Sequence, residues 1–422
     1  MKLLHFSDLH IGVENYGRPD AETGMSTRLV DFLTSYDELV HYAISNEVDA
    51  VLFAGDAYKS RDPSQTHQRE FAKRVARLAG ENIPVYLLTG NHDLPAVAER
   101  ASALEIFPTL DVEQVFVCDS LNTQTILTRS GPLQIVGLPW IRRSQYLTRE
   151  DTNNLTLDQI TSRLQERLTN ALNWQLESLD PNVPSVLVAH VTASGSVVGS
   201  ERSMMLGRDH VLMLSTLASQ KLDYVALGHI HKHQVLNANP MVVYSGSLQR
   251  VDFSEERDEK GFCVIELDQR KSQGQRLTTF TFQTVQARPF KTIDVEVQAN
   301  DSPTERVLEI IRNRRNSSSP GSDIVDAIVR VRIYIPEQLV GLLNDNDIRE
   351  ALHDAHYVSI YHHVERTQRL RITPEASRGL SPTEALKLYL ETRGTDQDRI
   401  TSLLDHADAL IQEEFGEPSD DS

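Results

Sequence analysis

The chain has 422 residues, of which 40% are hydrophobic and 24% are charged, and it carries a net charge of −18 at pH 7. This length predicts about two to four domains, and the composition excludes both a disordered chain and a protein embedded in a membrane. The negative charge argues against a broad DNA-binding surface driven by bulk electrostatics, but it permits a local basic or metal-centred groove.

The two cysteines and the first residues indicate where the protein resides. Cys118 and Cys263 lie in apolar runs, so we expect buried free thiols, and two cysteines are too few for a cysteine-based zinc site. The chain starts directly with a strand pattern, KLLHFSD, and no window is long and apolar enough to span a bilayer. We therefore expect a soluble cytoplasmic protein that does not act at a membrane.

Patterns of buried strands alternate with helical patterns through the first two thirds of the chain. The strand patterns are, in order, KLLHFSD, DAVLFAGD, PVYLLTG, PSVLVAH and DYVALGH. Helical spacing of apolar residues covers 27–46, 64–79, 96–107 and 155–178. Residues 240–285 then show mostly strand patterns. The sequence therefore predicts a layered α/β or mixed-sheet α+β domain.

The chain changes character after residue 287. Ser302-Pro303-Thr304-Glu305 is a capping-box start of a helix, and strand patterns surround that helix, which predicts a small α+β module. The same signature recurs at Ser381-Pro382-Thr383-Glu384, before two helices whose apolar stripes we expect to dock on the body or on a partner helix pair. The predicted segments are a first domain over 1–287, the small module over 288–366, a linker over 367–380, the C-terminal helices over 381–414 and an acidic tail over 415–422.

Five of the apolar strand patterns end in polar residues. In open α/β sheets, ligands bind beyond the carboxyl ends of the strands, so five distant segments can deliver their side chains to one cleft. Each motif alone is weak, because Asp-x-His often only caps a turn and a single histidine is more often structural. Together and in this order, the motifs predict one functional site formed by Asp8, His10, Asp56, Asn91, His92, Asp93, His190, His229 and His231.

The residue types in this set indicate a metal site. Carboxylates, imidazoles and an amide oxygen without thiolates suit manganese, iron, or zinc with open positions. Asp56 is alone on its loop and is a natural bridge between two ions. Two cations ~3.5–4 Å apart can clamp the attacking and leaving oxygens of a phosphoryl displacement. The glycines before Asp56, Asn91 and His229 allow the chain to turn sharply next to such ions.

The order of these motifs resembles the calcineurin-like metallophosphoesterase superfamily. The motifs are D-x-H, G-D, G-N-H-D, H and G-H-x-H, and they cover residues 8–231. Three stretches are more specifically similar to SbcD-type DNA-repair nuclease subunits: MKLLHFSDLHIG, GDAYKSRDPS, and YSGSLQRVDFSEE with KGF shortly after it. The resemblance implies a β-sandwich flanked by helices, with a small α+β capping domain and C-terminal helices that bind a partner.

The resemblance also implies a role for each site residue. Seven residues would hold two divalent ions, manganese in this family, with Asp56 as the bridge. The first ion would be held by Asp8, His10, Asp56 and His231, and the second by Asp56, Asn91, His190 and His229. His92 would contact the scissile phosphate instead of a metal, and Asp93 would orient a histidine through a hydrogen bond.

The function that the resemblance implies is that of a DNA exonuclease and endonuclease. Such a protein hydrolyses phosphodiester bonds at DNA ends and hairpins in DNA repair, recombination and replication. It acts beside SbcC, an SMC-like coiled-coil ATPase, as a homodimer within a heterotetramer.

Two alternatives to a DNA nuclease stay open. One is a phosphatase or phosphodiesterase for a small-molecule or nucleotide substrate, and the other is an assembly protein with structural metals. The roughly 130 residues beyond the catalytic domain argue against the first, because a small-substrate hydrolase needs no such appendage. The intact ligand set with His92 argues against the second.

Four further residues are candidates for contact with DNA. Lys59 and Arg61 follow the second motif and could bind the phosphate backbone, or they could be solvated loop cations. Arg250 follows a strand and a small-residue turn, which makes it a candidate for the groove. His233 shares the parity of the two histidines before it but lies farther along, as a groove-edge or structural residue.

Overall fold

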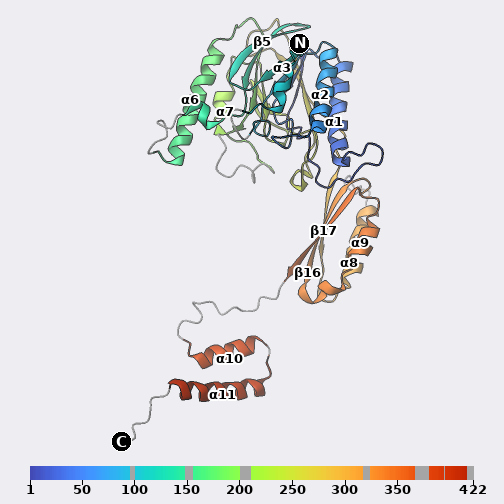
Figure 1. The fold of residues 1–422 in the computed structure, drawn as a ribbon, viewed down its shortest axis with the longest axis vertical. Coiled ribbons are helices and arrows are strands. Elements are labelled where there is room, and N and C mark those ends of the chain that lie inside the picture. Colours follow the sequence, from blue (N-terminus) through green and yellow to red (C-terminus); the bar gives the residue numbers. More distant parts are fainter. Residues whose placement is uncertain are drawn as a thin grey trace. The chain divides into compact units, whose positions relative to one another are not determined.

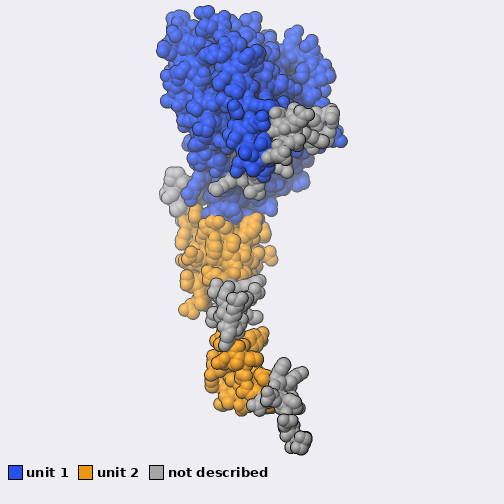
Figure 2. Space-filling model, turned by 90° about the vertical axis from the view of Figure 1, so that its left-hand side faces the viewer, with its two compact units in different colours: residues 1–293, 315–330, 352–359 blue, residues 294–314, 331–351, 360–422 orange. Residues whose placement is uncertain are grey.

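The computed structural model of the chain describes residues 1–95, 100–147, 155–199, 211–316, 324–365, 380–393 and 395–415. The chain forms two compact units, which Figure 2 distinguishes by colour. Unit 1 comprises Met1–Ile293, Arg315–Arg330 and Leu352–Ser359, and unit 2 comprises Asp294–Arg314, Val331–Ala351 and Ile360–Ser422. Among the helices of the described residues, none has the length and apolar character needed to cross a membrane.

Two six-stranded sheets form the centre of unit 1 (Figure 1). The first sheet has the order β14 (Leu277–Thr284), β13 (Gly261–Leu267), β1 (Lys2–Phe6), β2 (Ala50–Phe53), β3 (Val85–Leu88) and β4 (Val115–Cys118). The second sheet has the order β11 (Gln234–Ala238), β12 (Met241–Tyr244), β10 (Tyr224–Gly228), β7 (Ser185–His190), β6 (Gly131–Leu138) and β5 (Asn122–Thr128).

Alternate residues of the central strands face two different cores. In β1, Leu3 joins a core that the two sheets share, whereas Leu4 and Phe6 join a core shared with helices. Strands that are buried on both faces must be apolar throughout, which explains the continuous apolar runs in the sequence. Cys118 and Cys263 both belong to the core between the sheets and are free thiols, as predicted.

Helices cover the outer face of the first sheet (Figure 1). The apolar side chains of α1 (Thr27–Ser45) and α2 (Gln65–Gly80) recur at helical spacing and pack in one core with the strands. Helix α2 begins after Ser64, whose hydroxyl accepts a hydrogen bond from the His67 backbone N–H at 3.3 Å. The short elements η1 (Ala103–Glu105) and α3 (Ile106–Thr109) add Leu104 and Phe107 to this core.

The outer face of the second sheet is covered by α6 (Leu157–Glu177), which buries one leucine on each of four successive turns. Smaller elements complete this side of unit 1 or follow the second sheet: α4 (Arg143–Tyr146), β8 (Thr192–Ala193), β9 (Val211–Leu212), α7 (Leu214–Leu217) and η3 (Phe253–Glu255). The order of layers is therefore helix, sheet, sheet, helix, which confirms the predicted layered fold with flanking helices.

The last third of the chain contains a separate three-stranded sheet and a helical hairpin. The sheet has the order β15 (Phe290–Glu296), β16 (Ile328–Pro336) and β17 (Tyr357–Glu365), and the other elements of this region are α8 (Pro303–Asn316), η4 (Glu337–Leu342) and α9 (Asp345–Ala351). Helices α10 (Pro382–Thr392) and α11 (Gln397–Phe415) contact each other, and Ile400 is buried. The predicted capping box at the start of α10 is present, with the Glu384 N–H donating to Ser381 Oγ at 3.2 Å.

The helix predicted over 96–107 takes a different form. Residues 96–99 lie outside the described residues, and the rest of the segment forms the short elements η1 and α3. Ser102 starts η1 with a capping box, and Asp111, in the left-handed region with φ 52°, follows the end of α3. The apolar spacing of this segment thus reflects two short helical turns that pack on the core, not one long helix.

Candidate metal centre

The predicted ligands lie at the carboxyl ends of five strands from the two central sheets. They are Asp8 and His10 after β1, Asp56 after β2, Asn91 after β3, His190 at the end of β7, and His229 and His231 after β10. Strands β1, β2 and β3 are parallel, as are β7 and β10, so the carboxyl ends meet at one edge of each sheet. All of these side chains are buried except that of Asn91, which is half-buried.

Four of these residues have a left-handed backbone. The φ angles are 52° at Asp8, 47° at His10, 62° at Asp56 and 100° at His229. This conformation costs a non-glycine residue about 1–3 kcal/mol and persists only where the surrounding structure holds it. Here the loops hold one another, because the Asp8 N–H donates to the Gly55 carbonyl at 2.9 Å and the His10 N–H donates to the Asp56 carbonyl at 3.1 Å. Backbone strain of this kind is typical of functional sites.

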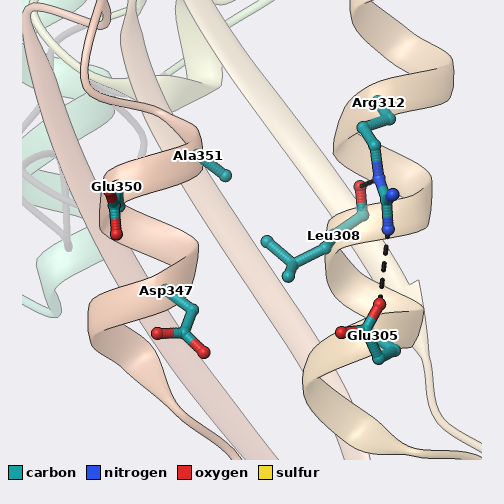
Figure 3. A pocket seen from close by; sticks show the side chains of 6 residues that line it. All are labelled: Glu305, Leu308, Arg312, Asp347, Glu350 and Ala351. Atoms are coloured by element: carbon teal, nitrogen blue, oxygen red, sulfur yellow. Dashed lines mark hydrogen bonds and ion pairs between the residues drawn. The ribbon is translucent and has the colours of Figure 1, made fainter.

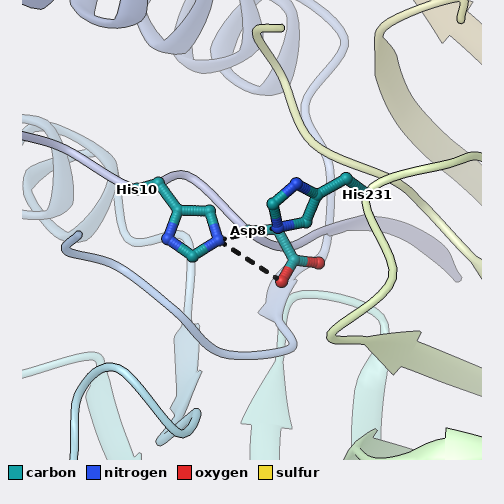
Figure 4. Close-up of side chains that lie close together, drawn as sticks. All are labelled: Asp8, His10 and His231. Atoms are coloured by element: carbon teal, nitrogen blue, oxygen red, sulfur yellow. Dashed lines mark hydrogen bonds and ion pairs between the residues drawn. The ribbon is translucent and has the colours of Figure 1, made fainter. Parts of the chain in front are cut away.

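Asp8, His10 and His231 form a first cluster (Figure 4). The Nε2 atoms of His10 and His231 are 2.9 Å apart, and His10 Nε2 lies 4.0 Å from Asp8 Oδ1. One donor atom from each of the three residues lies within 4.8 Å of the others. Two imidazole nitrogens and a carboxylate that converge in a buried position have the chemistry of a divalent-metal site.

Asn91, His190 and His229 form a second cluster. Asn91 Oδ1 lies 3.0 Å from His190 Nε2 and 3.1 Å from His229 Nδ1. The indole ring of Trp140 lies beside this cluster, with its centroid 4.9 Å from that of the His229 ring. An amide oxygen thus lies within about 3 Å of two imidazole nitrogens, next to the indole ring of Trp140.

Asp56 lies between the two clusters. Its Oδ2 atom is 3.4 Å from His190 Nε2 and 3.8 Å from His10 Nε2, so one carboxylate oxygen faces a histidine of each cluster. Its Oδ1 atom accepts a hydrogen bond from the His92 N–H at 2.8 Å. The bridging role of Asp56 stays a prediction, and the carboxylate lies within 4 Å of a histidine of each cluster.

Charge interactions favour the ionised form of the central carboxylate. Burial opposes the charge on Asp56, but His190, His92 and His10 together outweigh it and hold the pKa of Asp56 well below its usual value. Burial also opposes the charge on His190, yet Asp56 raises the pKa of His190 to about 9. Burial is the largest influence on the other two residues: it raises the pKa of Asp8 and, together with the charge of His231, lowers the pKa of His10 well below its usual value.

The residues present fit two divalent ions. The donor atoms are nitrogens and oxygens, and Asp56 faces a histidine of each cluster. Hydrogen bonds from Nδ1 of two histidines fix which ring nitrogen faces the centre. His190 donates from Nδ1 to the Ala54 carbonyl at 2.7 Å, and His231 donates from Nδ1 to Glu255 at 2.8 Å. In both rings Nε2 is therefore left as the ligand atom.

His92 lies at the edge of this centre, half-buried, and its ring centroid is 5.0 Å from that of His10. Its Nδ1–H donates to the Lys59 carbonyl at 2.9 Å, which leaves Nε2 as the other ring nitrogen. His10, Asp56 and His92 also bring ligand atoms within 4.8 Å of one another, so His92 borders the first cluster directly. Its half-buried ring can meet a bound substrate.

Asp93 is placed differently from the prediction that it orients a histidine. Its carboxylate accepts hydrogen bonds from the backbone N–H groups of Asp56 at 2.8 Å, Ala57 at 2.9 Å and Gly90 at 2.9 Å. Asp93 thus ties the loop after β3 to the loop after β2 and holds Asp56 in its left-handed conformation.

Two of the four candidate DNA contacts are engaged in structural interactions. The Arg250 guanidinium donates to the carbonyls of Asp258 at 2.8 Å, Arg288 at 3.1 Å and Ala287 at 3.2 Å, so the groove role expected for Arg250 does not match its position. His233 donates from Nδ1 to the Tyr244 carbonyl at 2.9 Å and stacks on a phenylalanine ring, which favours the structural interpretation of this histidine.

The other two candidates remain open to solvent. Arg61 is exposed and Lys59 is half-buried, and within the described part of the chain neither side chain has a hydrogen bond or ion pair. The charge of Lys59 contributes to the lowered pKa of His10, which places this lysine near the first cluster.

Glu255 and Lys260 are both buried behind His231, and neither is among the residues predicted from the sequence. Glu255 accepts the hydrogen bond from His231, and Lys260 Nζ lies 2.7 Å from the other oxygen of Glu255. Glu255 lies in the stretch YSGSLQRVDFSEE and Lys260 in KGF. Both stretches resemble SbcD-type nuclease subunits, but the resemblance gave neither residue a role.

A cavity of about 390 Å³ lies between α8 and α9 in unit 2 (Figure 3). Glu305, Asp347 and Glu350 line it, and the guanidinium of Arg312 is paired with Glu305 at 3.4 Å. This acidic lining disfavours a phosphate group, and none of the predicted ligands belongs to it.

Comparison with known proteins agrees with this arrangement. Residues 1–233 match the family described as calcineurin-like phosphoesterase. The chain is 25% identical to the SbcD component of the nuclease SbcCD from Staphylococcus epidermidis over 347 residues, which covers 80% of this chain and 84% of the relative. It is 24% identical to the DNA double-strand break repair protein Mre11 of Archaeoglobus fulgidus over 333 residues, 74% of this chain and 65% of the relative.

A further relative, the SbcD component of the nuclease SbcCD from Escherichia coli, is 24% identical over 267 residues, 60% of this chain and 62% of the relative. The chain thus spans less than two thirds of the length of the last two relatives. The family match includes every predicted ligand and covers more than half of the sequence. This chain belongs to the calcineurin-like phosphoesterase family.

Proposed function

We propose that this chain is a component of a DNA nuclease and hydrolyses phosphodiester bonds at DNA ends and hairpins with two divalent metal ions, manganese by preference. The observation that carries the proposal is the pair of ligand clusters that share Asp56, with His92 beside them. The names of the relatives, the nuclease SbcCD and Mre11, support DNA as the substrate.

The residues of the centre divide into ligands and a substrate contact. One ion would be held by Asp8, His10, Asp56 and His231, and the other by Asp56, Asn91, His190 and His229. When bound, two such ions act as Lewis acids on the phosphate and lower the pKa of water, so that a nucleophile is available at neutral pH.

The chain's own groups orient the reaction. Asp8 is held by the Ser7 hydroxyl at 2.5 Å and by the His229 N–H, so its carboxylate faces the centre in a fixed position. Because Nδ1 of His92 donates to the Lys59 carbonyl, Nε2 is the atom that can give a proton to the leaving oxygen or stabilise its charge. Lys59 and Arg61 supply positive charge for the DNA backbone near this edge.

We assign the remaining segments by the same proposal. Residues 1–287 would be the nuclease domain, 288–366 a capping domain that contacts DNA, and 381–414 the helices that bind an SbcC-type coiled-coil ATPase, joined by the linker 367–380 and followed by the acidic tail 415–422. The exposed apolar side chains of α10 and α11, which support a partner at these helices, are Leu388, Tyr389, Leu403 and Leu410. The complex would be a heterotetramer built on a homodimer of this chain, acting in cytoplasmic DNA repair, recombination and replication.

The test is cleavage of linear and hairpin DNA by the purified protein, with and without manganese and with the ATPase partner present. We expect manganese-dependent cleavage that an Asp8→Ala variant lacks. Hydrolysis of nucleotide monoesters without cleavage of polymeric DNA would instead indicate a small-substrate phosphodiesterase or phosphatase.

A further inference from the structure

The histidines of the candidate metal centre differ in the hydrogen-bond partners of their Nδ1 atoms. His190 donates from Nδ1 to a backbone carbonyl, that of Ala54, at 2.7 Å. His231 donates from Nδ1 to a side chain, Glu255 Oε1, at 2.8 Å. The Nδ1 atom of His10 is buried and has no hydrogen-bond partner among the described residues. The first cluster therefore depends on a side chain for its orientation, whereas His190 of the second cluster depends on the main chain.

Glu255 is itself held in place by a buried network. Lys260 Nζ lies 2.7 Å from Glu255 Oε2, and the Val251 N–H donates to the same oxygen at 3.1 Å. Lys260 also donates to the His231 carbonyl at 3.1 Å and to the Ser247 hydroxyl at 2.9 Å. An ammonium group at ion-pair distance and a backbone N–H donor on the same oxygen are the partners of an ionised carboxylate. Glu255 is therefore an ionised acceptor whose position is fixed.

An ionised carboxylate can only accept hydrogen bonds, so the hydrogen must sit on Nδ1 of His231. That tautomer places the lone pair on Nε2, the atom that lies 2.9 Å from His10 Nε2 in the first cluster. The hydrogen bond of Glu255 thus reaches a ligand of the first cluster, His231, and its other oxygen faces Lys260 and the Val251 N–H.

We infer that Glu255, buttressed by Lys260, is a positioning residue that sets the affinity of the centre for one of its two ions, the one held with His10 and His231. The inference rests on the proposed two-metal centre. Loss of the hydrogen-bond partner of a metal ligand weakens metal binding about 10- to 100-fold. Because Glu255 bonds to His231, a ligand of the first cluster, we expect only the ion of that cluster to bind more weakly.

The experiment is a manganese titration of the metal-free full-length protein by calorimetry, with electron paramagnetic resonance to distinguish paired from single ions. In the Glu255→Gln variant we expect one of two binding events to weaken by about 10- to 100-fold and the other to stay as in the wild type. The spectrum at intermediate manganese should change from that of a coupled pair to that of a single ion. This variant should resemble His231→Ala, with one event lost, and differ from His190→Ala.

Two companion variants separate positioning from other effects. Glu256→Gln is the matched control, because its carboxylate bonds to Thr292 instead of a ligand, and we expect both binding events to be unchanged. Glu255→Leu combined with Lys260→Met removes both charges, so that no ammonium group is left buried alone. If this double variant also loses one event, the loss comes from the missing acceptor and not from a stranded charge.

Three results would overturn the inference: wild-type affinities for both ions in the Glu255 variants, an equal weakening of both binding events, or the same selective loss in Glu256→Gln. The outcome is independent of DNA cleavage. A wild-type protein that binds two ions but does not cut DNA would contradict the proposed nuclease function and leave this inference standing. A wild-type protein that binds no pair of ions would contradict both.

Discussion

His92 differs from its histidine neighbours because its Nδ1–H is bound to the Lys59 carbonyl on the loop after Asp56, while its ring lies next to that of His10. In a His92→Ala variant we expect the rate of DNA cleavage to fall by about 10²- to 10⁴-fold, the usual contribution of an acid–base group. Manganese binding should be retained, since His92 is not among the proposed ligands.

Cleavage assays at saturating manganese, together with the titration described above, check this prediction. His41→Ala, a change on α1 away from the ligand loops, is a suitable control and should cleave at the wild-type rate. A His92→Ala protein that binds only one ion would show instead that His92 is a ligand.

The charge state of His190 predicts how metal binding depends on pH. Because Asp56 raises the pKa of His190 to about 9, the metal-free protein carries a proton on this imidazole at neutral pH, and an ion must displace it. We expect the apparent affinity for manganese to rise with pH by up to about tenfold per unit below pH 9, and to level off above it. Calorimetry in buffers of different ionisation enthalpy measures the released proton, and binding without proton release between pH 7 and 9 would refute the assignment.

Gly90 predicts a steric limit at the centre of the site. A Cβ atom at this position would lie 2.2 Å from Asp56 Oδ1 and 2.5 Å from the Asp56 backbone nitrogen. We expect Gly90→Ala to lower the free energy of unfolding by about 1–3 kcal/mol, the usual cost of overpacking, and to reduce metal binding because Asp56 must move. Denaturant unfolding is the measurement.

Gly80→Ala serves as the matched control for that substitution. Gly80 ends helix α2, and a Cβ atom there would meet nothing within 4 Å. We expect this change to be neutral or to stabilise the protein by up to about 1 kcal/mol, since alanine favours a helix over glycine. An equal loss of unfolding free energy in Gly90→Ala and Gly80→Ala would mean that crowding against Asp56 does not cause the destabilisation.

The first two turns of helix α1 contain a buried network of charges. Arg28 is fully buried and donates to Asp31 at 2.8 Å, and Arg288 donates twice to the same carboxylate at 2.6 Å. Asp31→Ala would leave Arg28 buried without its carboxylate, and we expect the free energy of unfolding to fall by about 3–5 kcal/mol.

Asp37, on the same helix, provides the control for that change. It pairs with Arg74 at 2.5 Å but its side chain is 35% exposed, so we expect Asp37→Ala to cost about 1 kcal/mol or less. Denaturant unfolding compares the two variants, and similar losses would contradict the importance of burial.

The elements of the fold could be predicted from the sequence wherever a local pattern determines them. The apolar runs of the central strands and the helical spacing of α1, α2 and α6 are local properties, and strand ends in parallel sheets converge, so the gathering of Asp8, Asp56 and His190 could also be expected.

Hydrogen-bond partners could not be predicted in the same way. Arg250 is a groove candidate by sequence because it follows a strand and a small-residue turn. Nothing in that local pattern shows that carbonyls 37 and 38 positions later accept its hydrogen bonds. Asp93 was expected to hold a histidine, but the backbone N–H groups that it binds are invisible to patterns of side chains. Glu255 lacked a role for the same reason, since its partner lies on another loop.

The C-terminal helical hairpin separates the proposed partner binding from the metal centre. Helices α10 and α11 contact each other and contribute no predicted ligand. Under the proposed function, a chain truncated after residue 365 should keep the manganese affinity and the DNA cleavage of the isolated full-length protein, but lose the proposed binding to an SbcC-type ATPase.

Co-purification and calorimetry with the ATPase measure this loss. Leu403→Asp, on an exposed position of α11, should weaken partner binding without truncation, whereas Glu391→Gln on α10 should not. A truncated protein that still binds the ATPase would place the partner surface elsewhere.

The position of β1 within its sheet has a consequence for synthesis. This strand leads to Asp8 and His10, and it pairs with β2 on one side and with β13 on the other, so that Leu3 lies opposite both Ala50 and Ile265. The earliest ligands therefore leave the ribosome long before the strand that flanks them. A nascent chain that has not yet extended β13 has an incomplete first sheet. We therefore expect the ligand loops after β1 to reach their final positions only when most of the protein has been made.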